Sequence, residues 1–178
     1  QTVPDSDGVL KNALHNMVLS TDLTAPDWNL SRLDSVVESG VSPSGKPAYL
    51  LTEDTGTGVH AVYDVYTYTS GHYYKFVTDF KANGSRIFSN QLPSAVFGAA
   101  VQWTFDPATM TATQDTGGTN DAGFITSLGD DWYQAVVYVQ ATTTTGGSSY
   151  WMANNGSNHS YTGDGSSGVY LSRPRVMK

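Results

Sequence analysis

The residues that most constrain the fold lie in one stretch, Leu50–Ala82, which reads LLTEDTGTGVHAVYDVYTYTSGHYYKFVTDFKA. β-branched and aromatic side chains occur there at the density that favours β-strands. The last strand candidate, His72–Ala82, alternates, with Tyr74, Phe76, Thr78 and Phe80 on one face and Tyr73, Lys75, Val77, Asp79 and Lys81 on the other. We expect the first set to lie in the core and the second to meet solvent or a ligand. A register shift of one residue would bury Lys75 and Asp79 without partners, so the register should be well specified.

The connection before this strand is short. Only Ser70 and Gly71 separate it from the preceding strand candidate, Val59–Thr69. This spacing suggests a β-hairpin, and a crossover between two sheets is the alternative.

The rest of the chain predicts a single all-β domain. The chain has 178 residues, of which 18 are glycine and only 14% are charged. About ten short strand candidates at near-even spacing are typical of a sandwich or barrel, and we expect a two-sheet antiparallel β-sandwich of jelly-roll type. Residues 1–18 are expected to be a linker followed by a short helix over Val9–Val18, where apolar residues have helical spacing. The main domain is expected to span residues 19–178.

Charge and composition argue against several kinds of partner. The net charge is −7 and the nine basic residues are scattered along the sequence, which argues against a nucleic-acid groove. No apolar run reaches the ~18 residues of a membrane span, so we expect no membrane insertion. The chain has no cysteine, which excludes disulfides and thiolate metal sites.

No pattern in the sequence points to catalysis or to a cofactor. The four histidines (His15, His60, His72 and His159) are far apart and form no metal-binding motif. Asp5-Ser6-Asp7-Gly8 looks like the start of a calcium loop but lacks the remaining ligands, and the sequence leaves calcium binding open. The acidic residues cluster in turns, where an Asp side chain usually bonds to local backbone. We therefore predict a protein that is not an enzyme, with no catalytic residues, metal site or cofactor.

Aromatic residues beside amides predict a carbohydrate-binding surface. In Trp132–Ala141 one face is apolar throughout, and the other carries Trp132, Gln134, Val136, Tyr138 and Gln140. Sugars present flat C–H faces and hydroxyl rims, which bind aromatic rings flanked by amides. Tyr63, Tyr73 and Trp151 are further candidates for this surface. The alternative is that these rings cover an edge of the sandwich or contact another subunit.

Six segments, in this order, resemble carbohydrate-binding-module-like jelly-roll domains of phage tail-fibre and other virion proteins. They are STDLTAPDW (Ser20–Trp28), SPSGKPAYLLTEDTGTGVH (Ser42–His60), YTSGHYYKFVTDFKA (Tyr68–Ala82), WTFDPATMT (Trp103–Thr111), LGDDWYQAVV (Leu128–Val137) and YTGDGSSGVYLSRPRV (Tyr161–Val176). The match runs from about Leu19 to the end of the chain. It departs at Ser172-Arg173-Pro174-Arg175, where a more apolar strand is usual. The family has no fixed binding residues to carry over.

The resemblance implies a non-catalytic module on a virion surface or in an extracellular setting. Such a module contacts host-surface glycans or helps to hold a fibre together, and it assembles as a homo-oligomer, often a trimer, or with other virion proteins. The alternative is a carbohydrate-binding module of a secreted bacterial polysaccharide-degrading enzyme. A purely structural capsid or tail component without a ligand fits the same strands.

Overall fold

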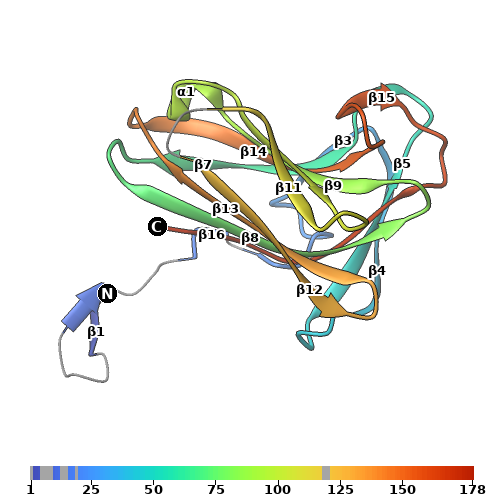
Figure 1. The fold of residues 1–178 in the computed structure, drawn as a ribbon, viewed down its shortest axis with the longest axis horizontal. Coiled ribbons are helices and arrows are strands. Elements are labelled where there is room, and N and C mark those ends of the chain that lie inside the picture. Colours follow the sequence, from blue (N-terminus) through green and yellow to red (C-terminus); the bar gives the residue numbers. More distant parts are fainter. Residues whose placement is uncertain (1, 5–9, 13–15, 19, 118–120) are drawn as a thin grey trace.

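Two six-stranded antiparallel sheets pack face to face (Figure 1). The computed structural model describes residues 2–4, 10–12, 16–18, 20–117 and 121–178. The first sheet, here the β14 sheet, contains in spatial order β11 (Thr111–Thr116), β10 (Val101–Asp106), β9 (Ile87–Leu92), β14 (Thr145–Asn154), β7 (Ala61–Tyr68) and β3 (Asn29–Ser31). The second, the β8 sheet, contains β12 (Ala122–Gly129), β13 (Trp132–Gln140), β8 (Tyr73–Asn83), β16 (Gly168–Met177), β5 (Pro47–Glu53) and β4 (Leu33–Val41). The expected two-sheet antiparallel β-sandwich is confirmed.

Small elements complete the fold. Strand β6 (Thr57–Val59) pairs with β15 (Ser160–Thr162) in a lobe at one end, and α1 (Ser94–Phe97) is a single helical turn at the other (Figure 1). Among the described residues, no helix is long and apolar enough to cross a lipid bilayer.

The helix expected over residues 9–18 is wrong wherever the structure describes that segment. Leu10–Asn12 forms strand β2, which pairs with β1 (Thr2–Pro4). Asn16 and Met17 bond to the backbone of Val176 at the end of β16, and residues 9 and 13–15 lie outside the described residues. So short an amphipathic segment is marginal as an autonomous helix, whereas pairing with another strand satisfies its backbone groups.

The alternation of β8 is confirmed on its inner side. Tyr74, Phe76, Thr78 and Phe80 are all buried between the sheets. The outer side is less uniform than expected, because Val77 and Asp79 are buried too.

Asp79 is buried with partners. Its carboxylate accepts hydrogen bonds from Ser44 Oγ and Gln134 Nε2, both at 2.9 Å. The turn between β4 and β5 thus packs against this outer face. The Asp79 carboxylate holds that turn and the neighbouring strand β13 in place.

The connection through Ser70 and Gly71 is a crossover between sheets. β7 belongs to the β14 sheet and β8 to the other, so the hairpin is wrong and the alternative is correct. Gly71 has a φ of 81°, which favours glycine, and its N–H donates to the carbonyl of Ala141 at 2.7 Å. The chain changes sheets again from β8 to β9, from β11 to β12 and from β13 to β14, as in a jelly roll.

Trp151 lies at the centre of the core. Its ring is fully buried and meets the ring of Trp28 edge-on at 5.3 Å between centroids. Its Nε1–H donates to Thr78 Oγ1 at 2.7 Å, which joins β14 to β8 across the core. A buried indole needs such a partner, since an unpaired N–H in the interior costs free energy.

Replacing Trp151 should therefore destabilise the fold. We expect Trp151→Ala to lower the free energy of unfolding by about 4 kcal/mol, because it leaves a large cavity. Tyr73→Ala, at an exposed side chain, should change it by less than about 0.5 kcal/mol. Urea denaturation followed by circular dichroism measures both. Equal stability of the two variants would contradict the central role of Trp151.

Candidate functional site

Most of the side chains predicted on β13 are engaged within the protein. Trp132 points away from the inter-sheet core, yet only 7% of it is exposed. Gln134 is bound to the Asp79 carboxylate, and Gln140 Nε2 donates to the carbonyl of Gly71 at 3.0 Å. These three residues are therefore poorly placed to contact a ligand directly.

Tyr138 remains accessible on this face. Its ring meets that of Phe124 edge-on at 6.1 Å, and Lys75 Nζ lies 5.2 Å from its centroid. Tyr73, on the same face of the sheet, is also exposed. Of the predicted carbohydrate-binding residues, only Tyr138 and Tyr73 are thus accessible on this face. The structure places Phe124, which was not predicted, beside Tyr138.

The other two predicted residues lie elsewhere. Trp151 is in the core and cannot stack on a surface ligand. Tyr63 lies on the outer face of the β14 sheet, where it stacks on Tyr150 with ring centroids 4.8 Å apart and planes 27° apart. Tyr63 and Tyr73 are therefore on opposite faces of the sandwich.

The Tyr63–Tyr150 pair is part of a row across the β14 sheet, here the cross-strand row. Register places Gln102, Gln91, Tyr150, Tyr63 and Asn29 side by side on five neighbouring strands. Their sequence neighbours face the core, so this row faces outward. Adjacent members are about 4.8 Å apart along it.

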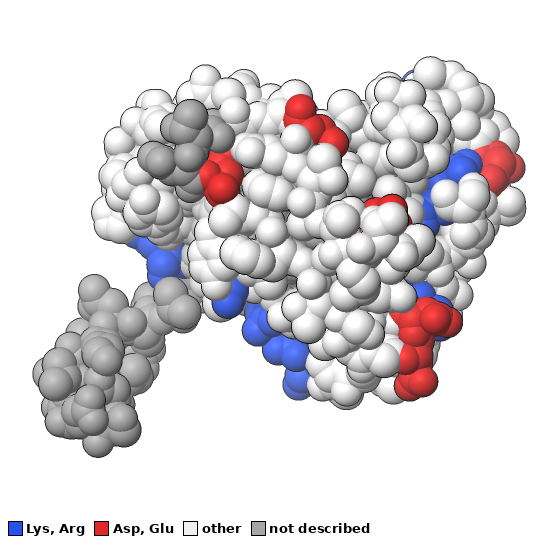
Figure 2. Space-filling view, viewed as in Figure 1, with Lys and Arg blue, Asp and Glu red and all other residues white. Residues whose placement is uncertain are grey.

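Three hollows lie over this face, and two of them adjoin. One of about 490 Å³ and one of about 260 Å³ share Gln91 and Tyr150 in their walls. The first is also lined by β6 and the second by the start of α1. A third of about 230 Å³ is lined by Gln102, Asn154 and His159. We call the three hollows together the groove. In Figure 2 the upper margin of the molecule is hollowed beside the lobe that carries β15 in Figure 1.

The third hollow holds a connected set of polar side chains. Asp115 accepts hydrogen bonds from Thr104 Oγ1 at 2.5 Å and from Gln102 Nε2 at 3.4 Å. Gln102 Nε2 also lies 2.8 Å from His159 Nδ1. An amide nitrogen can only donate, so Gln102 is the donor of this contact. These side chains are thus held in place before any ligand arrives.

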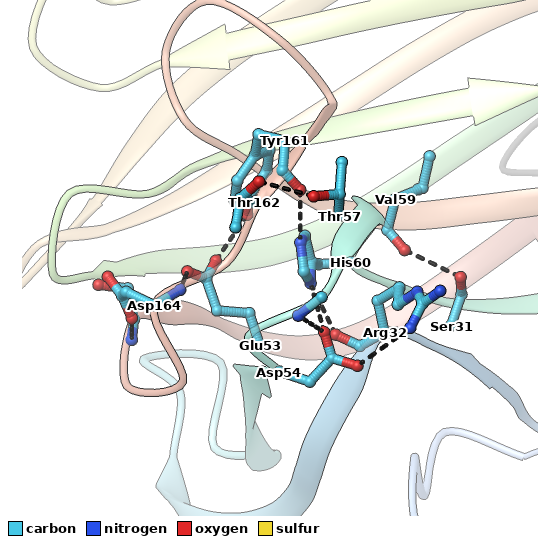
Figure 3. A network of polar contacts seen from close by, with 12 residues as sticks. Ser31, Arg32, Glu53, Asp54, Thr57, Val59, His60, Tyr161, Thr162 and Asp164 are labelled. Carbon is cyan, nitrogen blue, oxygen red and sulfur yellow. Dashed lines mark hydrogen bonds and ion pairs between the residues drawn. The ribbon is translucent and has the colours of Figure 1, made fainter.

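A buried acidic residue anchors the lobe that forms one wall of the groove. Glu53 has no exposed surface, and Figure 3 shows it reaching Tyr161 and Asp164. Its carboxylate accepts two hydrogen bonds from the Arg86 guanidinium, one from the Tyr161 hydroxyl at 2.7 Å and one from the Asp164 N–H at 2.7 Å. Burial alone would raise the pKa of Glu53, but these hydrogen bonds outweigh it and lower the pKa below its ordinary value of 4.5.

His60 ties the same lobe to the body of the sandwich. It is fully buried, with Nδ1 at 2.6 Å from the carbonyl oxygen of Arg32 and Nε2 at 3.2 Å from that of Tyr161 (Figure 3). Its role is therefore to hold two loops together.

Acidic residues in turns bond to local backbone, as the sequence predicts. Asp54 accepts from the Gly56 N–H and Asp164 from the Ser166 and Ser167 N–H groups. In the part of the chain that the structure describes, no three His, Asp or Glu side chains cluster in a way that suits a metal ion.

The sequence interpretation named Tyr63 of the cross-strand row but missed Tyr150 and the polar residues that line the groove. Tyr150 precedes Trp151, and strand alternation requires that only one of the two faces the core. The sequence therefore held a signal for Tyr150. Gln91, Gln102, Asp115 and His159 come from separate elements, and no local pattern joins them.

No model of a known protein family matches this sequence, and no curated protein matches it.

The buried carboxylate should make the stability of the protein sensitive to acid. Folding lowers the pKa of Glu53, so its stabilisation is complete above the unfolded value and is lost as the pH falls through the folded value. Stability should thus decline below about pH 4.5. Glu53→Gln should cost about 3 kcal/mol at pH 7, because it removes the buried counter-charge of Arg86 and leaves only the partly exposed Asp164 carboxylate, 3.2 Å away.

Denaturant unfolding between pH 3 and pH 7 measures this. Asp131→Asn is the control, since its exposed carboxylate makes only a surface ion pair, 3.8 Å from Lys81. The role assigned to Glu53 is wrong if both variants retain the stability of the unaltered protein at pH 7.

Proposed function

We propose that this chain is a non-catalytic glycan-binding β-sandwich whose site is the groove on the β14 sheet. The observation that carries the proposal is the stacked Tyr63–Tyr150 pair between Gln91 and Asn29, beside hollows lined by polar groups. Sugar rings stack on aromatic faces, and their hydroxyls pair with amides and carboxylates.

The spacing of the cross-strand row suits an extended oligosaccharide. Neighbouring strands are about 4.8 Å apart, close to the length of one sugar unit, so successive units would meet successive side chains. The hydrogen bonds that already hold Gln102, Asp115 and His159 reduce the entropy lost when a ligand binds.

The acidic residues of the groove favour binding over hydrolysis. Glycoside hydrolysis ordinarily uses two carboxylates that flank the scissile bond. Among the described residues that line the three hollows, Asp115 is the only carboxylate. It is committed to hydrogen bonds with Thr104 and Gln102.

The proposed setting is a virion surface or tail fibre, where the module contacts host-surface glycans as part of a homo-oligomer or with other virion proteins. The support is the family resemblance of the six segments together with the jelly-roll arrangement of the strands. A carbohydrate-binding module of a secreted bacterial enzyme is the alternative setting for the same site. Sequencing the adjoining genes distinguishes the two.

If the groove is the binding site, Tyr150 should contribute to oligosaccharide affinity. Tyr150→Ala should weaken binding of a neutral oligosaccharide, first identified on a glycan array, by about tenfold, the loss of one stacking contact of about 1.4 kcal/mol. Tyr150→Phe keeps the ring and should retain most of the affinity. Isothermal titration calorimetry measures both, and thermal unfolding checks that each variant is folded.

Tyr138→Ala is the matched control, because it removes the same side chain from the opposite face. It should leave the binding of the neutral oligosaccharide unchanged. Loss of binding in Tyr138→Ala with full binding in Tyr150→Ala would move the site to the β8 sheet. An intact protein that binds no glycan on the array would refute the proposed function.

A further inference from the structure

The outer face of the β8 sheet carries a diagonal stripe of exposed rings. Tyr73 on β8, Tyr138 on β13 and Phe124 on β12 are 57%, 38% and 53% exposed. Tyr138 lies opposite Lys75, two residues from Tyr73, and Phe124 lies opposite Val136, two residues from Tyr138. Such diagonal neighbours are about 7–8 Å apart, so the aromatic stripe is about 15 Å long.

Basic side chains border the aromatic stripe. Lys75 Nζ is 5.2 Å from the Tyr138 ring, and Arg175 follows on β16, opposite Val77. Figure 2 shows Lys and Arg side chains gathered along the lower margin, below β8 and β16 of Figure 1. A positive face is thus present on a protein with a net charge of −7.

Arg175 is the second cation beside the aromatic stripe. Its Nε is buried and has no hydrogen-bond partner in the part of the chain that the structure describes. Burial and the neighbouring Arg173 lower the pKa of Arg175, and Asp79 only partly opposes them. An added carboxylate would stabilise its charged form.

Acidic side chains scarcely offset this charge near the aromatic stripe, because Asp131 pairs with Lys81 towards the other end of β8. Of the described outward-facing residues on β12, β13, β8 and β16, only Asp79 is a carboxylate. It is buried and already bound by Ser44 and Gln134.

We propose that this face is a second binding surface and that its ligand is an acidic polysaccharide. Sugar rings would stack along Tyr73, Tyr138 and Phe124, and carboxylates would pair with Lys75 and Arg175. The aromatic stripe is long enough for about three sugar units at the spacing of a strand pair. The surface lies on the opposite side of the sandwich from the groove, so it does not depend on the function proposed there.

Other acidic polymers fit this face less well. Double-stranded nucleic acid carries one charge per about 1.7 Å of its axis, a much higher charge density than one carboxylate per sugar unit, and it needs clustered cations that two cations beside three rings do not provide. An acidic polypeptide offers carboxylates without flat sugar faces at a regular spacing. A linear uronic-acid polymer offers both.

The test uses one polymer backbone with and without its charge. Polygalacturonate should bind the intact chain, and the fully methyl-esterified polymer should bind at least about tenfold more weakly, as expected for lost charge-assisted contacts. Lys75→Gln should weaken polygalacturonate binding by a similar factor. Lys81→Gln is the matched control, because it removes the same charge from the same face about 20 Å along β8 and should have no effect. Biolayer interferometry at 0.1 M salt measures all four.

Ring variants separate the two surfaces. Tyr138→Ala should reduce polygalacturonate binding, Tyr138→Phe should retain it, and Tyr150→Ala on the opposite sheet should retain it as well. Thermal unfolding confirms that the variants are folded. Equal binding of the acidic and esterified polymers would overturn the proposal. So would poly-L-glutamate binding that equals polygalacturonate binding and is unaffected by Tyr138→Ala, because that result describes a charge patch for polypeptides.

Discussion

The hydrogen bond from Trp151 to Thr78 joins the two sheets through the middle of the core. It is a polar contact in an apolar interior, and it is worth most when both groups are fully desolvated. The pair fixes which sides of β14 and β8 face inward. Their outward neighbours follow by alternation: Tyr150 on one sheet, and Val77 and Asp79 on the other. Both proposed binding surfaces therefore depend on which sides of β14 and β8 face the core.

The groove depends on a second, charged contact at the end of the sandwich. The β6–β15 lobe supplies one wall, and the Glu53–Arg86 pair holds the residues beside it. Burying two charges is costly, and the cost is offset only because every oxygen of Glu53 is hydrogen-bonded. The shape of the proposed binding surface is thereby linked to the folding free energy.

The sequence predicts which side chains of a strand face the core when they alternate regularly. It misses contacts between residues that are far apart in the chain. The alternation of β8 correctly assigns Tyr74, Phe76, Thr78 and Phe80 to the core, because one buried face imposes a period of two. The same reasoning correctly leaves Tyr138 exposed. It fails for Gln134, whose partner Asp79 is 55 positions away and reaches it only through sheet pairing. It fails for Trp151 because the segment Tyr150–Ala153 is too short to show which side is apolar, and because the outward-facing Met152 and Asn154 at the C-terminal end of β14 are buried as well.

The net charge of −7 determines the electrostatic potential far from the protein, but it does not determine the potential close to any one face. At 0.1 M salt, charges interact over about 10 Å, roughly the separation of two packed sheets. The carboxylates of the β14 side, such as Asp115, are therefore largely screened from a ligand on the β8 side, whereas Lys75 would touch it. At 0.01 M salt the range grows to about 30 Å, and the whole acidic protein would then repel an anionic polymer. Overall acidity can thus argue against densely charged duplex nucleic acids and still permit one cationic, aromatic face to select a less densely charged uronic-acid polymer.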